Sequence, residues 1–321
     1  MSILVFIETE NKAIKKNAQE AIAYAKAVAN AQGGEVTALV MGDIDPSEAE
    51  KAGNFGASRV LHAADSKLEH DNSMAYASIL AEVIQQESSE LIILAKSGLA
   101  DAVAARAAAK LKAGIVSGVT ALPSFDGDGL TVQRSIFTGK AFSDTRITSK
   151  IKILVVNKNT IEVTPTTDTA VVETFSPTLN DKDFKATVQD TEKATGDILL
   201  TDADIIVSGG RGMKGPEHWQ PLLELASALG AATGCSKPVS DLDWRPHHEH
   251  IGQTGIKVAP NLYIACGISG AIQHLAGVNG SKCIVVINKD PEAPFFKAAD
   301  YGIVGDVFEI LPKLTEAIKN R

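Results

Sequence analysis

The chain has 321 residues, of which 45% are hydrophobic and 22% are charged, and its formal net charge is -8. This length suits two domains of ordinary size, and the acidic balance argues against nucleic acid, whose phosphates require a basic surface. No run approaches the roughly 20 apolar residues of a membrane helix, and the first residues show no secretory signal. Cys235, Cys266 and Cys283 match no metal spacing, so we expect buried thiols in a reducing compartment and no metal site.

Strand and helix signals alternate through the first third of the chain. Short apolar runs predict strands at residues 3–7, 36–41, 59–63 and 91–95. Helical spacing predicts a helix that Asn11 caps and that Gly33 and Gly34 end. Further helices are expected over residues 48–55, 74–86 and 100–112. This alternation is typical of parallel strands with helices on both faces of the sheet.

The pattern changes near residue 115, where predicted strands follow one another without helices. These strands cover residues 116–122, 130–137, 151–157 and 171–175, and a glycine-rich turn at residues 126–129 joins two of them. The polar stretch 178–195 is the predicted linker. We therefore expect an N-terminal α/β domain over residues 1–192 and a second domain over residues 193–321.

The second domain returns to alternating strands and helices, and it is rich in glycine. Of the 26 glycines of the chain, 15 lie at or beyond Gly196, mostly where a predicted strand ends. Those strands cover residues 204–208, 262–266, 282–287 and 301–304. Ligands of open parallel sheets bind at the carboxyl ends of the strands, so four such turns predict one extended ligand along the edge of the sheet.

Two of these turns are suited to an anion. Residues 210–215 (GRGMKG) fit the glycine fingerprint of dinucleotide sites, but the acidic residue expected about 20 positions later is absent. Arg211 among backbone amides is suited to a pyrophosphate. Residues 267–270 (GISG) open a predicted helix at 271–276, and Ser269 there either helps to bind an anion or is an ordinary cap. The alternative for Arg211 is a tight turn with a surface arginine.

Several polar residues elsewhere in this domain have both a ligand-binding and a structural interpretation. His274 is placed one turn into the helix, where it either faces the ligand or is structural. The segment 253–255 (QTG) suits close approach to a planar ligand, and Lys237, after Ser236 in a stretch without helical period, is a candidate free cation. Each of these two segments is otherwise an ordinary loop. The histidines and glutamate of segment 247–250 have the wrong spacing for a helical zinc pair, which favours a solvated loop.

Sequence signatures of acid–base and nucleophilic catalysis are not found. The sequence has no nucleophile elbow, no Walker lysine loop and no HExxH pair. A ligand-rich domain without such groups indicates that a cofactor carries the chemistry. We therefore predict no catalytic residue.

Five segments in order resemble the FAD-binding domain of electron-transfer flavoprotein α subunits. These segments are 208–212 (SGGRG), 252–260 (GQTGIKVAP), 267–277 (GISGAIQHLAG), 287–294 (INKDPEAP) and 299–302 (ADYG). The resemblance covers the chain from about residue 204 to its end. The N-terminal part agrees with the family only in its length and in its alternation of strands and helices. The resemblance implies an α/β fold, with an N-terminal βα domain that has extra strands and a flavodoxin-like, doubly wound parallel-sheet domain that binds FAD.

The resemblance also implies a place for each candidate residue. Arg211 and Ser269 would hold the pyrophosphate, and Thr254 with Gln253 would lie near N5 of the flavin. His274 would face O2 of the flavin. Asn288 and Asp306 would hold the adenosine end. The whole implied FAD-binding set is Arg211, Gly212, Ser236, Lys237, Gln253, Thr254, Gly267, Ser269, Gly270, Gln273, His274, Asn288 and Asp306.

This chain departs from the family at one of these positions. The family usually has arginine after the serine beside the isoalloxazine ring, and this chain has Lys237. Lysine keeps the charge but loses the planar stacking surface of a guanidinium. Lysine at this position is therefore expected to change the redox potential of the flavin and not whether FAD binds.

The function implied by the resemblance is that of an electron carrier and not of an enzyme. It would pass single electrons from acyl-CoA dehydrogenases or similar flavoprotein donors of fatty acid β-oxidation to a membrane-bound flavoprotein–quinone oxidoreductase. A β subunit carrying AMP would complete a heterodimer, in the cytoplasm of a bacterium or the mitochondrial matrix of a eukaryote. The alternative is a bifurcating member that also oxidises NADH.

Two rival functions can be weighed from the residues alone. A nicotinamide dehydrogenase would need an acidic clamp for the ribose and an acid that handles the hydride, and neither is found. A purely structural βα protein would not need polar residues such as Arg211, Thr254 and Asp306 at the ends of its strands. The visible spectrum separates these functions, since only a flavin makes the protein yellow.

Overall fold

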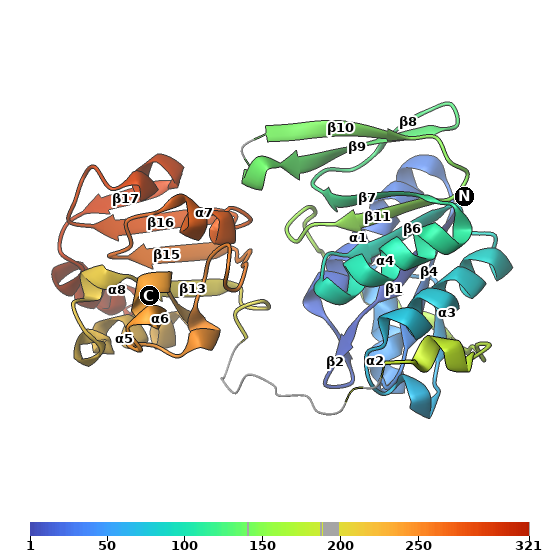
Figure 1. Cartoon of the computed structure of the whole chain (residues 1–321), viewed down its shortest axis with the longest axis horizontal. Coiled ribbons are helices and arrows are strands. Elements are labelled where there is room, and N and C mark those ends of the chain that lie inside the picture. The colour runs from blue at the N-terminus through green and yellow to red at the C-terminus, as the bar shows by residue number, and fades with distance from the viewer. Residues whose placement is uncertain (140, 187, 189–198, 321) are drawn as a thin grey trace. The chain divides into compact units, whose positions relative to one another are not determined.

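The computed structural model describes residues 1–139, 141–186, 188 and 199–320 (Figure 1). The chain divides into two units, Met1–Thr191 and Glu192–Arg321, and each is described by itself. Each unit has its own sheet and its own buried clusters of apolar side chains. Among the described residues, no helix is long and apolar enough to cross a bilayer.

The first unit is built on a ten-stranded sheet in the order β10-β9-β7-β11-β6-β1-β4-β5-β12, with β8 paired to β9. Its strands are β1 Ser2–Ile7, β4 Glu35–Met41, β5 Arg59–Ala63, β6 Leu91–Ala95, β7 Gly114–Val119, β8 Ser124–Asp126, β9 Gly129–Ile136, β10 Ala141–Ile147, β11 Lys152–Val156 and β12 Val171–Thr174. From β7 to β12 in that order all pairs are parallel, whereas β8, β9 and β10 pair antiparallel. The predicted parallel sheet with added strands is confirmed.

Helices cover both faces of this sheet. They are α1 Lys16–Gln32, α2 Pro46–Glu50, α3 Ser73–Gln86 and α4 Gly98–Leu111. Side chains of α1 share one buried cluster with Ile3, Val5 and Ile7 of β1, and those of α3 and α4 form the cluster on the opposite face. A strand covered on both faces is apolar at every position, which is why residues 3–7 are an uninterrupted apolar run.

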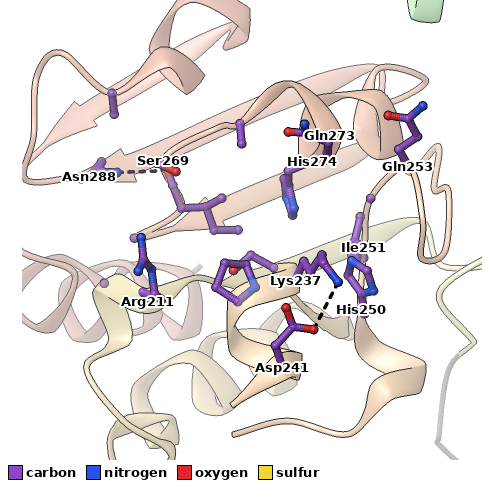
Figure 2. Close-up of a pocket in the computed structure, with 18 of the residues that line it drawn as sticks. Arg211, Lys237, Asp241, His250, Ile251, Gln253, Ser269, Gln273, His274 and Asn288 are labelled. Atoms are coloured by element: carbon purple, nitrogen blue, oxygen red, sulfur yellow. Dashed lines mark hydrogen bonds and ion pairs between the residues drawn. The ribbon is translucent and has the colours of Figure 1, made fainter. Parts of the chain in front are cut away.

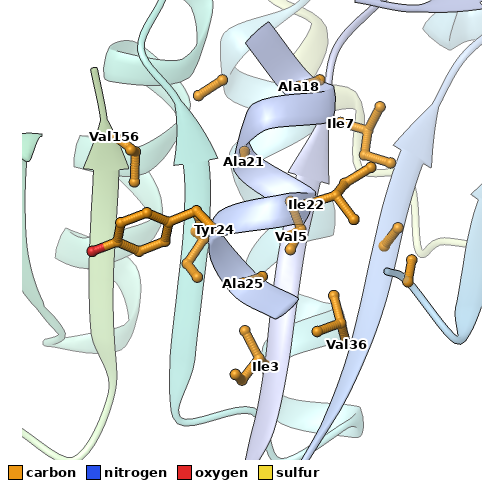
Figure 3. Close-up of a cluster of buried hydrophobic side chains, with 14 of the residues drawn as sticks. Ile3, Val5, Ile7, Ala18, Ala21, Ile22, Tyr24, Ala25, Val36 and Val156 are labelled. Atoms are coloured by element: carbon orange, nitrogen blue, oxygen red, sulfur yellow. The ribbon is translucent and has the colours of Figure 1, made fainter. Parts of the chain in front are cut away.

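Tyr24 anchors α1 to the sheet (Figure 3). Its ring is fully buried in the same cluster as Val5 and Val156. Its hydroxyl donates a hydrogen bond to the carbonyl oxygen of Ala121, at 2.8 Å. Small alanines such as Ala21 on the same helix let the backbone approach the sheet closely, so the large ring fills the remaining space.

The predicted cap of the first helix is wrong. Asn11 and Lys12 have φ values of 49° and 62° and form the turn of a small hairpin, β2 Thr9–Glu10 with β3 Ala13–Ile14. Two successive residues with positive φ are typical of the tight turns that join paired strands. The helix therefore begins at Lys16, and it ends at Gly33 as predicted, where φ is 71°.

Three other features of this unit differ from the prediction. The turn at residues 126–129 joins β8 to β9, and the strand predicted to reach residue 122 ends at Val119. Strand β10 was not predicted, because its residues are only partly buried and mostly polar. The first part of the predicted linker packs on the unit, since the backbone N–H of Thr178 donates to the Glu82 carboxylate at 3.0 Å and Phe184 contacts the α3 cluster. The rest of the predicted linker, except residue 188, lies outside the described residues.

The second unit contains a five-stranded sheet in the order β14-β13-β15-β16-β17, and all its pairs are parallel. Its strands are β13 Ile205–Gly209, β14 Ala232–Cys235, β15 Leu262–Cys266, β16 Cys283–Asn288 and β17 Tyr301–Val304, and its helices are α5 Gln220–Leu229, α6 Lys237–Asp241, α7 Ile272–Val278 and α8 Val307–Lys319. In order of sequence the strands are arranged 2-1-3-4-5, the flavodoxin-like order. The predicted fold class is confirmed.

The short strand β14 was not predicted, because Thr233 is its only residue with a strong preference for strands. Helices α5 and α8 cover one face of the sheet, and a cluster that includes Tyr263 and Phe295 lies on the other. Cys235 and Cys266 are buried as expected, whereas Cys283 is half-buried.

Candidate cofactor-binding site

The topological switch point of the second unit lies between β13 and β15. In sheets of this order, ligands bind outside the carboxyl ends of the strands at the switch point. A cavity of about 540 Å³ lies there (Figure 2), lined by the turns that follow β13, β15 and β16 together with α6, α7 and the 250–254 segment. This volume is within the range of about 300–1,000 Å³ that is usual for sites of small molecules and cofactors.

The turns after β13 and β15 are pressed together at the base of the cavity. The N–H of Gly212 donates to the carbonyl oxygen of Gly267 at 3.0 Å. A Cβ atom on Gly210 would lie 2.3 Å from that oxygen, and one on Gly212 would lie 2.6 Å from the Gly267 Cα. Only glycine fits at these positions, and at Gly212 and Gly267 the backbone itself lines the cavity.

Arg211 lies between these glycines and points its guanidinium along the cavity wall (Figure 2). Its side chain is exposed, and it forms no ion pair with any of the described residues. An arginine without a carboxylate partner keeps its planar donors available for a bidentate anion. The geometry therefore fits the predicted role at a pyrophosphate.

Ser269 and Asn288 stand at the next two turns. Ser269 is exposed to the cavity, and its carbonyl oxygen accepts a hydrogen bond from the N–H of Phe295 at 3.0 Å. Asn288 is buried, donates to the Ile268 carbonyl oxygen at 3.0 Å and accepts from the Asp290 N–H at 3.0 Å. Asn288 thus fixes the Ser269 turn from the end of β16, in addition to lining the cavity.

Two residues of the predicted set are not on the cavity wall. Gly270 has a φ of +83°, and a Cβ atom on it would lie 2.5 Å from Phe295. Glycine is therefore needed there for the turn to pass close to Phe295. Asp306 caps α8 by accepting from the Phe308 N–H, which lowers the pKa of its carboxyl, and it pairs with Lys214 at 3.6 Å. Its predicted contact with the adenosine end stays a prediction.

The expectation of a free Lys237 in a segment without helix is wrong in both parts. Lys237 is the first residue of the short helix α6, which Ser236 precedes, and its ammonium pairs with Asp241 four residues later, at 3.3 Å (Figure 2). The helix has only five residues, too few to show a period in the sequence. Pro238 near its start is consistent with a first turn. Asp241 also lines the cavity, so the positive charge there is partly compensated.

The predicted solvated loop at residues 247–250 is also wrong in part. Glu249 and His250 are buried, Glu249 is paired with Arg245, and its Oε1 accepts from the Thr233 hydroxyl at 3.3 Å. The arginine balances the buried carboxylate, which explains why a charged residue lies inside. His250 lines the cavity, a contact that the spacing of the histidines did not indicate.

The loop that carries Gln253 and Thr254 is held firmly against α7. The N–H of Gln253 donates to the Gln273 carbonyl oxygen at 2.7 Å, and a Cβ atom on Gly277 would lie 2.6 Å from the Gly252 Cα. This close contact of two backbones explains the glycine near the end of α7. Gln253, Thr254 and Gln273 all line the cavity.

His274 is buried at the back of the cavity. Its Nε2 shares a hydrogen bond of 2.8 Å with the Tyr263 hydroxyl, and its ring packs edge to face with that of Phe295, with centroids 5.7 Å apart. Burial lowers the pKa of His274 to about 4, so the ring is neutral at pH 7. Its Nδ1 is buried and forms no hydrogen bond of normal geometry with the described residues, although a weaker contact with the backbone of Ile251 acts to raise the pKa of the ring. A ligand atom on this side would complete its hydrogen bonding.

The structure thus brings most of the predicted set to one cavity. Those on its wall are Arg211, Gly212, Ser236, Lys237, Gln253, Thr254, Gly267, Ser269, Gln273, His274 and Asn288. Sequence reasoning missed Asp241 and His250. For Asp241 the available signal was its spacing, because a carboxylate four residues after Lys237 can pair with it on a helix. For His250 the signal was its position in the sequence, just before the polar 252–255 segment.

A flavodoxin-like sheet with glycine backbone at its switch point, next to an arginine that no described residue pairs, is typical of domains for phosphate-bearing cofactors. Comparisons with known proteins narrow this class. The family model described as the electron transfer flavoprotein domain matches residues 3–180, and the one described as the electron transfer flavoprotein FAD-binding domain matches residues 199–279. The chain belongs to the electron transfer flavoprotein α subunit family.

Similar proteins from several bacteria carry the same name, electron transfer flavoprotein subunit alpha. The protein from Bacillus subtilis is 39% identical over 320 residues, which cover 99% of this chain and 97% of that one. The protein from Pseudomonas aeruginosa is 37% identical over 320 residues, covering 99% and 100%. The protein from Megasphaera elsdenii is 37% identical over 314 residues, covering 94% and 91%. The similarity extends over both units of the chain.

Proposed function

We propose that the second unit binds FAD along its sheet edge and that the chain works as an electron carrier without substrate chemistry of its own. The observation that carries this proposal is Arg211, a cation unpaired among the described residues, next to glycine backbone at the switch point. Arg211 and Ser269 bind the pyrophosphate, Thr254 and Gln253 lie near N5, and His274 offers its Nδ1 to O2. Bound FAD supplies the redox chemistry, and these residues hold and orient it.

The partners belong to the same proposal. A β subunit that carries AMP completes a heterodimer and docks on the N-terminal unit. Electrons come from acyl-CoA dehydrogenases or similar flavoproteins and leave to a membrane-bound flavoprotein–quinone oxidoreductase. A bifurcating protein would instead hold a second FAD in its β subunit, so the number of FAD molecules per heterodimer and the rate of flavin reduction by NADH separate the two functions.

Purification of the chain with its β subunit tests cofactor identity. We expect a yellow heterodimer that releases FAD on denaturation, because the candidate contacts extend from Arg211 to Asn288 and suit a whole dinucleotide. Chromatography and mass spectrometry of the released flavin identify it. FMN alone, or a colourless heterodimer, would contradict the proposal.

Assembly gives a second prediction. We expect the chain without its β subunit to retain FAD poorly, since a carrier must leave part of its flavin open to partners and the β subunit covers the rest. Size-exclusion chromatography with absorbance at protein and flavin wavelengths measures this for the chain alone and for the heterodimer. A stable homo-oligomer of this chain with a full complement of FAD would argue against a required β subunit.

Lys237 gives a third prediction. A cation beside the isoalloxazine ring stabilises the negative charge that the flavin gains on reduction, so Lys237→Ala should lower the potential of the first one-electron couple. The charge is worth on the order of 1–4 kcal/mol at an effective dielectric constant near 20. Because Lys237 is 59% exposed and paired with Asp241, we expect about 1 kcal/mol.

Two further variants make this experiment sharper. Lys237→Arg keeps the charge and adds a stacking surface, so it should leave the one-electron-reduced state at least as stable. Asp241→Asn removes the compensating charge and should raise the potential. Spectroelectrochemical titration of the variants measures these shifts. Equal potentials in wild type, Lys237→Ala and Asp241→Asn would show that this pair does not act on the flavin.

A further inference from the structure

His250 is a buried imidazole at the wall of the cavity. It forms a parallel β-bridge with Cys235, the last residue of β14, and only 3% of its surface is exposed. Figure 2 shows it close to Lys237, on the side of the cavity where Gln253 also lies. Its Nδ1 is buried and has no hydrogen-bond partner among the described residues. Such an atom in a native structure requires an explanation.

The turn formed by residues 252–255 is packed directly on this ring. A Cβ atom on Gly255 would lie 2.7 Å from Nδ1 of His250, and one on Gly252 would lie 3.4 Å from its Nε2. The N–H of Ile256 donates to the His250 carbonyl oxygen at 2.8 Å, which fixes the turn relative to the ring. Since this turn carries Gln253 and Thr254, a change in the charge of His250 acts on the residues placed at the redox edge of the flavin.

The groups around His250 mostly favour its neutral form. Burial lowers its pKa, and so do His247, whose ring centroid is 5.7 Å away, and Lys237 on α6, whereas Asp241 on the same helix acts in the opposite direction. The neighbouring ion pair of Arg245 and Glu249 is balanced, and burial keeps His274 of α7 and the thiol of Cys235 neutral at pH 7. A new negative charge in the cavity would oppose these effects and favour the protonated ring.

An exposed histidine lies beside the buried ring. His247 is exposed, its Nδ1 shares a hydrogen bond of 3.2 Å with the Ser240 hydroxyl, and its ring lies beside that of His250. Histidine is the side chain whose ordinary pKa lies nearest to neutral pH. The buried ring of His250 thus has an exposed imidazole as its direct neighbour.

We propose that His250 is a positioning residue that takes up a proton when the bound flavin is reduced and releases it on oxidation. This inference rests on the proposed function. One electron from a reduced flavoprotein donor enters the cofactor, one proton from solvent binds the neutral imidazole, and the net charge of the cavity is unchanged. No covalent bond of the flavin is formed or broken in this step. The consequence is a redox potential that depends on pH through this protein side chain.

Potentiometric titration of the FAD-loaded heterodimer across the neutral range tests the coupling. One proton taken up per electron makes the potential of the first couple fall by about 59 mV for each pH unit. We expect wild type to approach this slope and His250→Gln, which keeps polar hydrogen-bonding atoms without a titrating group, to lose most of it. His248→Gln is the matched control, because His248 is an exposed neighbour that does not line the cavity, and it should keep the wild-type slope.

Equal slopes in wild type and His250→Gln would overturn the coupling. If His250→Gln fails to retain FAD, the pH titration of the imidazole NMR signals in the wild-type heterodimer decides instead. We expect the pKa of one buried histidine to be higher in the reduced than in the oxidised protein, and no such rise would overturn the inference. A heterodimer that contains no flavin would be a failure of the proposed function, and it is seen before any titration begins.

Discussion

Arg211→Ala is expected to weaken FAD binding by about 1.5–3 kcal/mol, the scale of a hydrogen bond to a charged group. The cofactor should therefore be lost on dilution or gel filtration from a heterodimer that holds it firmly in the wild type. The physical reason is that Arg211 makes no ion pair with the described residues and faces the cavity, so its removal leaves the fold intact and the pyrophosphate without its charged partner. Fluorescence of released FAD during dilution gives the dissociation constant.

Two control variants separate this role from a general effect of charge. Lys313→Ala removes one positive charge from the exposed side of α8, away from the cavity, and should leave FAD binding unchanged. Arg211→Lys keeps the charge without the planar fork and should give an intermediate loss. Equal FAD affinity in wild type and Arg211→Ala would show that the pyrophosphate is not bound at the switch point.

The sequence predicts the sheets well because burial on both faces leaves a simple pattern. Strands β5 and β6 begin and end at the predicted residues, and so do β15 and β17. The site follows from the same logic, since glycine at the end of successive parallel strands indicates where backbone and ligand meet. Arg211 and Ser269 were found on the cavity wall for this reason.

The errors have a common physical origin in short elements and in contacts that are distant along the chain. Asn11 looks like a helix cap, and only its positive φ in a two-residue turn shows the hairpin. The pairing of Lys237 with Asp241 requires a helix of five residues, and the burial of His250 requires the turn at 252–255 to fold over it. Neither is visible in the composition or periodicity of the segment itself.

Tyr24→Ala is expected to have the largest effect on stability, about 3–5 kcal/mol, because removing a large aromatic side chain from a packed core loses its burial and leaves a cavity. Tyr24 is fully buried between α1 and the first sheet. The matched variant Tyr24→Phe keeps the ring and removes only the hydrogen bond to the Ala121 carbonyl oxygen, which costs about 1 kcal/mol. Denaturant titration followed by circular dichroism measures both changes.

The same variant tests whether the two units are independent. The clusters of the second unit share no residue with the cluster around Tyr24, so loss of its ring should lower the unfolding midpoint of the first unit alone. Because two domains need not unfold as one, release of FAD is followed separately as the signal of the second unit. In the Tyr24→Ala heterodimer, we expect FAD to be released at the same denaturant concentration as in wild type, although the N-terminal unit unfolds at a lower concentration. A parallel shift of both signals would show that the FAD-binding unit depends on the first core, and that the division of the chain at residue 192 does not separate two folding units.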